Sequence, residues 1–166
     1  MASNKPTATK NSIKDVSKNV MISNTGQYIR KINFEHMISR LDVTKLGKVS
    51  ENKTFKLAPH VEKISDEEYE LVLLVQISSS IKDSEQELFQ LIFEYIGVFQ
   101  ISGEITESEK EKILLIQGAL LIFPFVRSEI ANITMKSGLQ PIMMDPVDFA
   151  NIYEAYNAQV DKKINQ

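Results

Sequence analysis

Two long apolar segments follow each other in the middle of the chain and constrain the fold more than any other feature. The first spans residues 69–77 and the second 88–101, and polar residues at 78–80 and 82–85 separate them. Apolar segments of this length with a polar connection are typical of two strands joined in a hairpin. The sequence therefore predicts a long antiparallel hairpin.

The second of these segments carries apolar side chains on both faces. Because side chains alternate along a strand, one face holds Phe89, Leu91, Phe93, Tyr95, Phe99 and Ile101. The other face holds Leu88, Ile92, Ile96 and Val98 among polar Gln90, Glu94 and Gln100. A sheet with one solvated face does not need this much apolar area. We therefore expect helices and a second copy of the chain to cover it, with a core or subunit-interface position for Phe89, Leu91, Phe93 and Tyr95.

Two further strands are predicted before the hairpin. Residues 28–35 alternate in period two, and so do residues 55–61, where Pro59 cannot donate to a ladder and predicts an irregular edge strand. Residues 37–52 read as a mixed helix or loop. Residues 1–26 show no sustained period and predict a flexible N-terminal tail, so the domain is expected to span 27–162.

Helix signals dominate the last third of the chain. Thr106 and Glu109 form a capping box for a short helix that is expected to end near Gly118. Pro124 suits the first turn of a second helix, which Gly138 would end in a left-handed conformation. Asp145 is the expected N-cap of a third helix, with one stripe formed by Phe149, Ile152, Tyr153, Tyr156 and Val160. Strands followed by helices predict an α+β domain.

Composition excludes several function classes. The net charge is -3 and no dense basic stripe is present, so nucleic-acid binding is not expected. The chain has no cysteine, which excludes disulfides and thiolate ligands. The longest apolar block, 119–126, is far shorter than the roughly 20 residues that span a bilayer, and the N-terminus lacks the apolar core of a secretory signal. We therefore expect a cytoplasmic protein with no membrane insertion.

No catalytic constellation stands out. Phosphate-loop, dinucleotide, zinc-protease and nucleophile-elbow motifs are all missing from the sequence, so we expect no ATP use, no cofactor and no metal. His36 and His60 each lie beside scattered carboxylates and are interpreted as ordinary surface or boundary residues. The acidic run 66–68 is interpreted as a solvated turn and the serines 78–80 as a hairpin end. A small enzyme that uses the two histidines remains a minor alternative.

Several motifs, in order along the chain, resemble the protein-export chaperone family SecB. They are Tyr28–Glu35, the strand 69–73, Gly97–Ile101, the block Leu121–Glu129 with its Phe-Pro-Phe-Val-Arg run, Pro141–Ile142 and Pro146–Phe149. The resemblance covers residues 28 to about 156, and the Phe-Pro-aromatic-x-Arg block and the Pro-Val-x-Phe helix start are its most specific parts.

This resemblance implies a four-stranded antiparallel sheet with C-terminal helices, assembled as a homotetramer, a dimer of dimers with its helices packed between two sheets. It also implies ATP-independent binding of unfolded, export-bound polypeptides in long apolar grooves. The positions that correspond to the groove are Phe55, Leu57, Val61, Met143, Met144, Phe149 and Tyr153. Aromatic rings and unbranched methionines suit contacts with varied partners. For Phe149, simple helix packing is the favoured alternative, and for Tyr153 and Phe55 both interpretations stay open.

The family also delivers its clients to the motor SecA, whose basic, zinc-bearing tail binds acidic residues on the exposed sheet face. Glu35 fits this pattern, but Lys31 stands where the family has an acid, and Gln90 with Ile92 replaces an acidic and apolar pair. These departures count against a hand-off to SecA. They keep open a divergent SecB-like chaperone for another client, such as an antitoxin, and a scaffold protein that binds no client.

Overall fold

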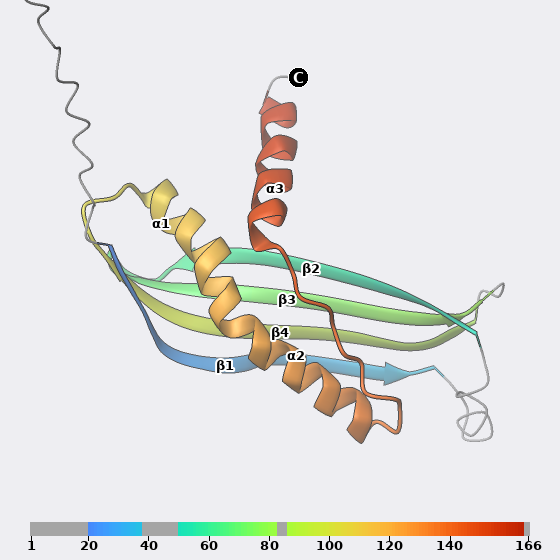
Figure 1. Ribbon diagram of the computed structural model, residues 1–166. Coiled ribbons are helices and arrows are strands. Elements are labelled where there is room, and N and C mark those ends of the chain that lie inside the picture. Colours follow the sequence, from blue (N-terminus) through green and yellow to red (C-terminus); the bar gives the residue numbers. More distant parts are fainter. Residues whose placement is uncertain (1–19, 38–49, 83–85, 165–166) are drawn as a thin grey trace, which may run out of the picture.

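The computed structural model describes residues 20–37, 50–82 and 86–164. A four-stranded sheet forms one layer, a long helix crosses one of its faces, and a last helix projects from the same side (Figure 1). The strands are β1 (Met21–His36), β2 (Glu51–Lys63), β3 (Glu68–Ile81) and β4 (Glu87–Ser102). The helical elements are α1 (Glu107–Ile113), the π-helical turn η2 (Leu114–Gly118), α2 (Ala119–Lys136) and α3 (Phe149–Ile164).

The sheet is antiparallel throughout and has the strand order β1-β4-β3-β2. The predicted hairpin is confirmed as β3 and β4, in a register that pairs Val75 with Phe93. The segment at 28–35 lies within β1. The segment with Pro59 lies within β2, which is an edge strand as that proline predicts. The expected α+β sheet with C-terminal helices on one face is therefore confirmed.

The N-terminal edge strand starts earlier than the sequence predicts. The predicted tail ends at residue 26, whereas β1 begins at Met21, which pairs with Ser102 of β4. Most β1 side chains are exposed on both faces, so the strand lacks the apolar alternation that would have revealed its start. Residues 1–19 and most of the mixed segment at 37–52 lie outside the described residues.

The core lies between the sheet and α2. The odd-numbered residues of the central parts of β3 and β4, including Leu73 and Phe93, face the helix and are buried together with Ile122, Val126 and Ile130. Burying one such side chain stabilises the fold by about 1.5–3 kcal/mol. The helix lies very close to the sheet at Gly97, where an added Cβ would be 3.0 Å from the Ile122 side chain and 2.7 Å from the Phe99 ring.

The first two predicted helices are one continuous helix of 30 residues, Glu107–Lys136. The Thr106 capping box is confirmed at its start, with the Glu109 amide donating to the Thr106 hydroxyl. The expected end at Gly118 is wrong, because this residue has helical angles and passes from η2 into α2. Pro124 lies inside α2 rather than in its first turn. Burial of the surrounding apolar residues against the sheet outweighs the roughly 3 kcal/mol that an internal proline costs.

Gly138 ends α2 as predicted, with a positive φ of 81°. The Leu139 amide donates to the Thr134 carbonyl and the Gly138 amide to the Met135 carbonyl, which is a Schellman motif. An extended segment then returns along α2, where the Ile142 amide donates to the Thr134 hydroxyl.

The last helix begins three residues later than the sequence predicts. Asp148, not Asp145, caps α3, and its carboxylate accepts from the Asn151 amide at 3.1 Å. Burial of Ile142 and Met144 holds the preceding chain in an extended conformation. The expected start at Asp145 and Pro146 is therefore wrong.

Candidate functional site: an apolar groove between β2 and α3

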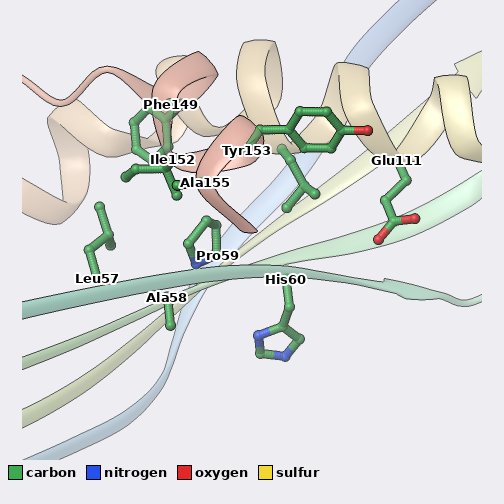
Figure 2. Close-up of a pocket in the computed structure, with 10 residues that line it drawn as sticks. Leu57, Ala58, Pro59, His60, Glu111, Phe149, Ile152, Tyr153 and Ala155 are labelled. Atoms are coloured by element: carbon green, nitrogen blue, oxygen red, sulfur yellow. The ribbon is translucent and has the colours of Figure 1, made fainter. Parts of the chain in front are cut away.

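A pocket of about 360 Å³ opens between the edge strand β2 and the first turns of α3 (Figure 2). Residues from α1 and η2 close one end of it. Its lining is predominantly apolar and consists of Leu57, Ala58, Pro59, His60, Glu111, Leu115, Phe149, Ile152, Tyr153 and Ala155. Pockets of this size and character hold large apolar side chains or small ligands.

The strand β2 supplies one wall through the alternation of its side chains. Leu57 and Pro59 point toward α3, whereas Ala58 and His60 point away and line the pocket near their backbone (Figure 2). Pro59 lies directly below the first turns of α3 and presents a rigid apolar ring. This wall is therefore built on an edge strand that pairs with β3 on its inner side.

The start of α3 supplies the opposite wall. Phe149 is 1% exposed and packs edge-on against Phe123, with ring centroids 5.4 Å apart. Ile152 and Tyr153 follow one turn later and are half-buried. The Lys112 ammonium lies 5.6 Å from the centre of the Tyr153 ring, within the range of a cation–π contact. Phe149 thus anchors the helix, and Tyr153 leaves part of its ring to the groove.

The groove residues expected from the sequence divide into two groups. Leu57, Phe149 and Tyr153 line the pocket. Phe55 lies on the same side of β2 as Leu57 and is 47% exposed, but it stands outside the pocket. Val61 is half-buried against the core. The remaining two, Met143 and Met144, do not line it either.

The two methionines precede α3 and have opposite environments. Met143 is 69% exposed, whereas Met144 is buried in the core. Adjacent residues of an extended segment point to opposite sides, so both could not share one groove surface. A groove role for Met144 is therefore wrong in this structure, because its side chain is not accessible.

Sequence reasoning missed the other lining residues, which are Ala58, Pro59, His60, Glu111, Leu115, Ile152 and Ala155. Ile152 was available from the helical stripe that contains Phe149. Leu115 could have been found from the continuous helix, had Gly118 not been taken as its end. Nothing in the sequence marks Glu111 and Ala155 as lining residues, since their positions depend on how α1 and α3 pack around the pocket.

A polar cluster fixes α1 beside this groove. The Lys110 ammonium donates to the Asp66 carbonyl at 3.0 Å, to the Tyr69 hydroxyl at 3.2 Å and to the Glu107 carboxylate at 3.1 Å. These contacts, with Tyr69 first and Glu107 next, raise the pKa of Lys110, and the Lys110 bond lowers the pKa of Glu107. The cluster joins α1 to the turn between β2 and β3, and so fixes the position of Glu111.

The aromatic face of β4 lies inside the single chain. Phe89, Leu91 and Phe93 are each at most 2% exposed, and Tyr95 is 6% exposed. Burial, with a smaller effect of Glu129, raises the pKa of Tyr95. These four residues therefore belong to the core under α2, and they leave almost no surface for a second copy. A subunit interface needs other residues.

The opposite, open face of the sheet carries paired charges. Arg30 follows Ile29 in a β-bulge, and its guanidinium donates to the carboxylates of Glu70 and Glu62. The bond with Arg30 lowers the pKa of Glu62, with a smaller effect of His60. Lys31 is opposite Glu94 in the register. Glu35, the expected SecA contact, is exposed and accepts from the Asn33 amide at 3.4 Å.

The two histidines do not form a shared site. His36 donates from Nε2 to the Ser137 carbonyl on the helix-covered face, at 2.8 Å. His60 lies 3.2 Å from the Glu62 carboxylate and points away from α3 (Figure 2). Within residues 20–37, 50–82 and 86–164, no three histidine, aspartate or glutamate side chains are arranged to hold a metal ion.

Among the described segments, the helix Glu107–Lys136 alone has the length and apolar composition of a membrane-crossing segment. The core helix of a globular protein meets the same two criteria, and the inward side of this helix packs on the sheet.

Comparison with known proteins gives one consistent family. The family model described as preprotein translocase subunit SecB matches residues 14–160. The protein-export protein SecB of Ruegeria sp. is 33% identical over 81% of this chain and 80% of its own length. That of Rickettsia typhi is 32% identical over 80% of this chain and 85% of its own. Among solved structures, the Mycobacterium tuberculosis SecB-like chaperone Rv1957, in complex with a peptide of the HigA1 antitoxin, superimposes with a TM-score of 0.64 at 12% identity, over 76% of this chain and 90% of its own.

Proposed function

Since the chain belongs to the SecB family, we propose that it is an ATP-independent chaperone that binds unfolded polypeptides and keeps them competent for export. The client segment lies in the groove between β2 and α3, with an apolar side chain in the pocket under Tyr153. The observation that carries this proposal is the open apolar pocket itself, which is lined by Leu57, Pro59 and Tyr153. Release of the client needs no nucleotide, because a client that folds buries the apolar side chains that the pocket binds.

In this proposal, tight binding of a client comes from several weak contacts at once. One pocket of about 360 Å³ accepts little more than one large side chain, so its affinity alone is low. Several copies in one particle raise the effective concentration of every further contact with the same client. We therefore propose a homotetramer built as a dimer of dimers, as the family resemblance implies.

The self-association surface that we propose lies between α2 and β1. Leu121 and Phe125 are 53% and 48% exposed, and they lie one turn apart on α2. Ile29 and Ile32 are exposed on β1, on the side that Tyr95 and Phe93 identify as the helix-covered face. This apolar surface replaces the buried β4 aromatics as the candidate for contact with a second copy.

Hand-off to SecA is the weaker half of the proposal. A basic SecA tail needs free carboxylates, but Arg30 engages Glu62 and Glu70, and Lys31 places a cation beside Glu94. Glu35 is the accessible acid in this part of the face. These charges favour weak docking to SecA and leave room for a divergent chaperone that serves a dedicated client, such as an antitoxin. Both versions act on unfolded chains in the cytoplasm.

The test is suppression of aggregation of a chemically unfolded protein at stoichiometric amounts of this chain. We expect suppression by the native chain and a marked loss in the Tyr153→Ser variant. Ile64→Ser is the matched control, because Ile64 is 55% exposed but lies outside the pocket. No suppression by the native chain would favour the scaffold alternative. Equal loss in both variants would contradict the location of the groove.

A further inference from the structure

Lys112 of α1 contacts the groove from outside, through the ring of Tyr153. Its ammonium lies over that ring, 5.6 Å from the ring centre. Tyr153 and Glu111 line the pocket, whereas Lys112 itself is not one of the lining residues. A cation over an aromatic ring is attracted by the negative face of the ring. The contact therefore joins α1 to a side chain that forms part of the groove.

The side of this contact that belongs to α1 is firmly held. The helix begins at the Thr106 capping box and continues without a break into the core helix that packs on the sheet. Two residues before Lys112, the Lys110 ammonium donates to the Asp66 carbonyl and the Tyr69 hydroxyl. A segment held by buried packing and by several hydrogen bonds has little freedom to move. Lys112 therefore projects from a rigid element.

The other side of the contact belongs to α3, which is anchored at its base. Phe149 is buried against Phe123, and Tyr153 is half-buried one turn later. Glu154 and Ala155 are exposed, and the helix projects away from the sheet (Figure 1). Among the α3 side chains that the structure describes, none forms a hydrogen bond or an ion pair with another element. The buried ring at the base thus leaves the direction of α3 to be set by a second contact.

The ammonium of Lys112 is not engaged elsewhere. Two residues away, the Lys110 ammonium lies 3.1 Å from the Glu107 carboxylate. Of the residues whose side chains the structure describes, none forms an ion pair with Lys112. The Tyr153 ring is therefore the group that directs the end of this side chain.

We propose that Lys112 is a positioning residue of the groove, whose ammonium holds the Tyr153 ring in place as a wall of the pocket. This inference rests on the proposed chaperone function and identifies what keeps the binding surface formed before a client arrives. Phe149 fixes the base of α3, and the contact one turn later fixes its direction over β2. A preformed wall lowers the cost in ordering that binding would otherwise carry. Lys112 thus acts through Tyr153 and does not touch the client.

Peptide binding to three lysine variants tests this proposal. The probe is a fluorescently labelled ten-residue peptide in which leucine alternates with serine, and its affinity is measured by fluorescence anisotropy. Lys112→Met removes the charge and keeps the apolar stem, so it should weaken binding about twofold to fivefold. Lys112→Arg keeps a cation that can lie over the ring and should restore the native affinity. Lys56→Met makes the same charge change on the face of β2 that points away from α3, and it should have no effect.

The melting temperature separates positioning from a general loss of structure. Lys112 and Lys56 are both exposed, so all three variants should melt with the native chain. Equal affinities of Lys112→Met and Lys56→Met would overturn the proposal. Binding by Lys112→Arg that is as weak as binding by Lys112→Met would also overturn it, because a cation over the ring would then not be what matters.

A double-mutant cycle shows whether Lys112 acts through the ring. Tyr153→Leu removes the ring and keeps an apolar side chain at the pocket. In that background Lys112→Met should have no further effect on peptide affinity, because the group that it positions is gone. An effect as large as in the native background would overturn the proposal, since the charge would then act on the peptide directly.

Nuclear magnetic resonance measures the contact without any client. Reductive methylation with a carbon-13 label marks the lysines and keeps their charge. The Lys112 methyl resonance, identified by its loss in Lys112→Arg, should be shifted upfield by the ring and should lose that shift in Tyr153→Leu. An unshifted resonance in the native chain would overturn the proposal. A shifted resonance in a chain that binds no peptide would support the contact and count against the chaperone function instead.

Discussion

Replacing Phe149 by alanine is expected to release the start of α3 from the body of the chain. The Phe149 ring is 1% exposed and packs edge-on against Phe123. Removing a buried phenyl group costs about 3–5 kcal/mol, which includes the roughly 0.5–1.5 kcal/mol of the ring pair. For a chain of this size that loss corresponds to a fall in melting temperature of about 10 °C. Urea unfolding and thermal melting measure it, and peptide binding should be lost because one wall of the groove is displaced.

Tyr153→Ala is the matched variant for this prediction. Tyr153 is on the next turn of the same helix but only half-buried, so its loss should weaken client binding with a cost in stability of less than about 1.5 kcal/mol. The two variants should therefore differ in their free energy of unfolding. A Phe149→Ala protein that melts like the native chain and still binds peptide would refute the anchoring role of this ring.

Three further changes test other parts of the structure. Gly97→Ala should destabilise the fold by about 1–3 kcal/mol in urea unfolding, because the new Cβ meets Ile122 and Phe99; Gly26→Ala, with ordinary contacts only, is its control. Phe125→Asp should split the native particle, as measured by its mass, whereas Phe93→Asp should unfold the chain because Phe93 is fully buried. The loss in free energy of unfolding of the Lys110→Met variant, relative to the native chain, should depend on pH. Because the pKa of Lys110 is raised in the folded chain, its contribution to stability is fully present below the ordinary value of 10.5. That contribution is lost as the pH rises through the pKa of Lys110 in the folded chain. Because the pKa of Glu107 is lowered in the folded chain, its contribution to stability is fully present above the ordinary value of 4.5. That contribution is lost as the pH falls through the pKa of Glu107 in the folded chain. A difference in urea midpoint from the native chain that stays constant across pH would contradict the ion pair.

The strands of the hairpin were predictable because each is a long apolar segment with one continuous apolar face, and a polar connection separates the two. β1 was found only in part, since a strand with two exposed faces shows no apolar period over its first residues. The helices were harder to delimit. Gly118 and Pro124 are local signals for helix ends, but both lie where apolar residues pack on the sheet, and packing overrides local preference.

The candidate site was predictable in its chemistry more than in its geometry. Leu57, Phe149 and Tyr153 were named from the family resemblance and line the pocket. The position of Met144 depends on which way an extended segment turns its side chains, and a chain without regular period does not reveal that. The free edge of β2 follows from strand order, which no local pattern in the sequence specifies.

Pro59 has a consequence for the behaviour of the chain at high concentration. A bare edge strand can stack with its own copies into fibrils, and a protein that keeps such an edge accessible carries that hazard permanently. Pro59 interrupts the row of donors after Leu57, and the cations of Lys53 and Lys56 repel an identical neighbour. Copies of this strand therefore have too short a contact to propagate.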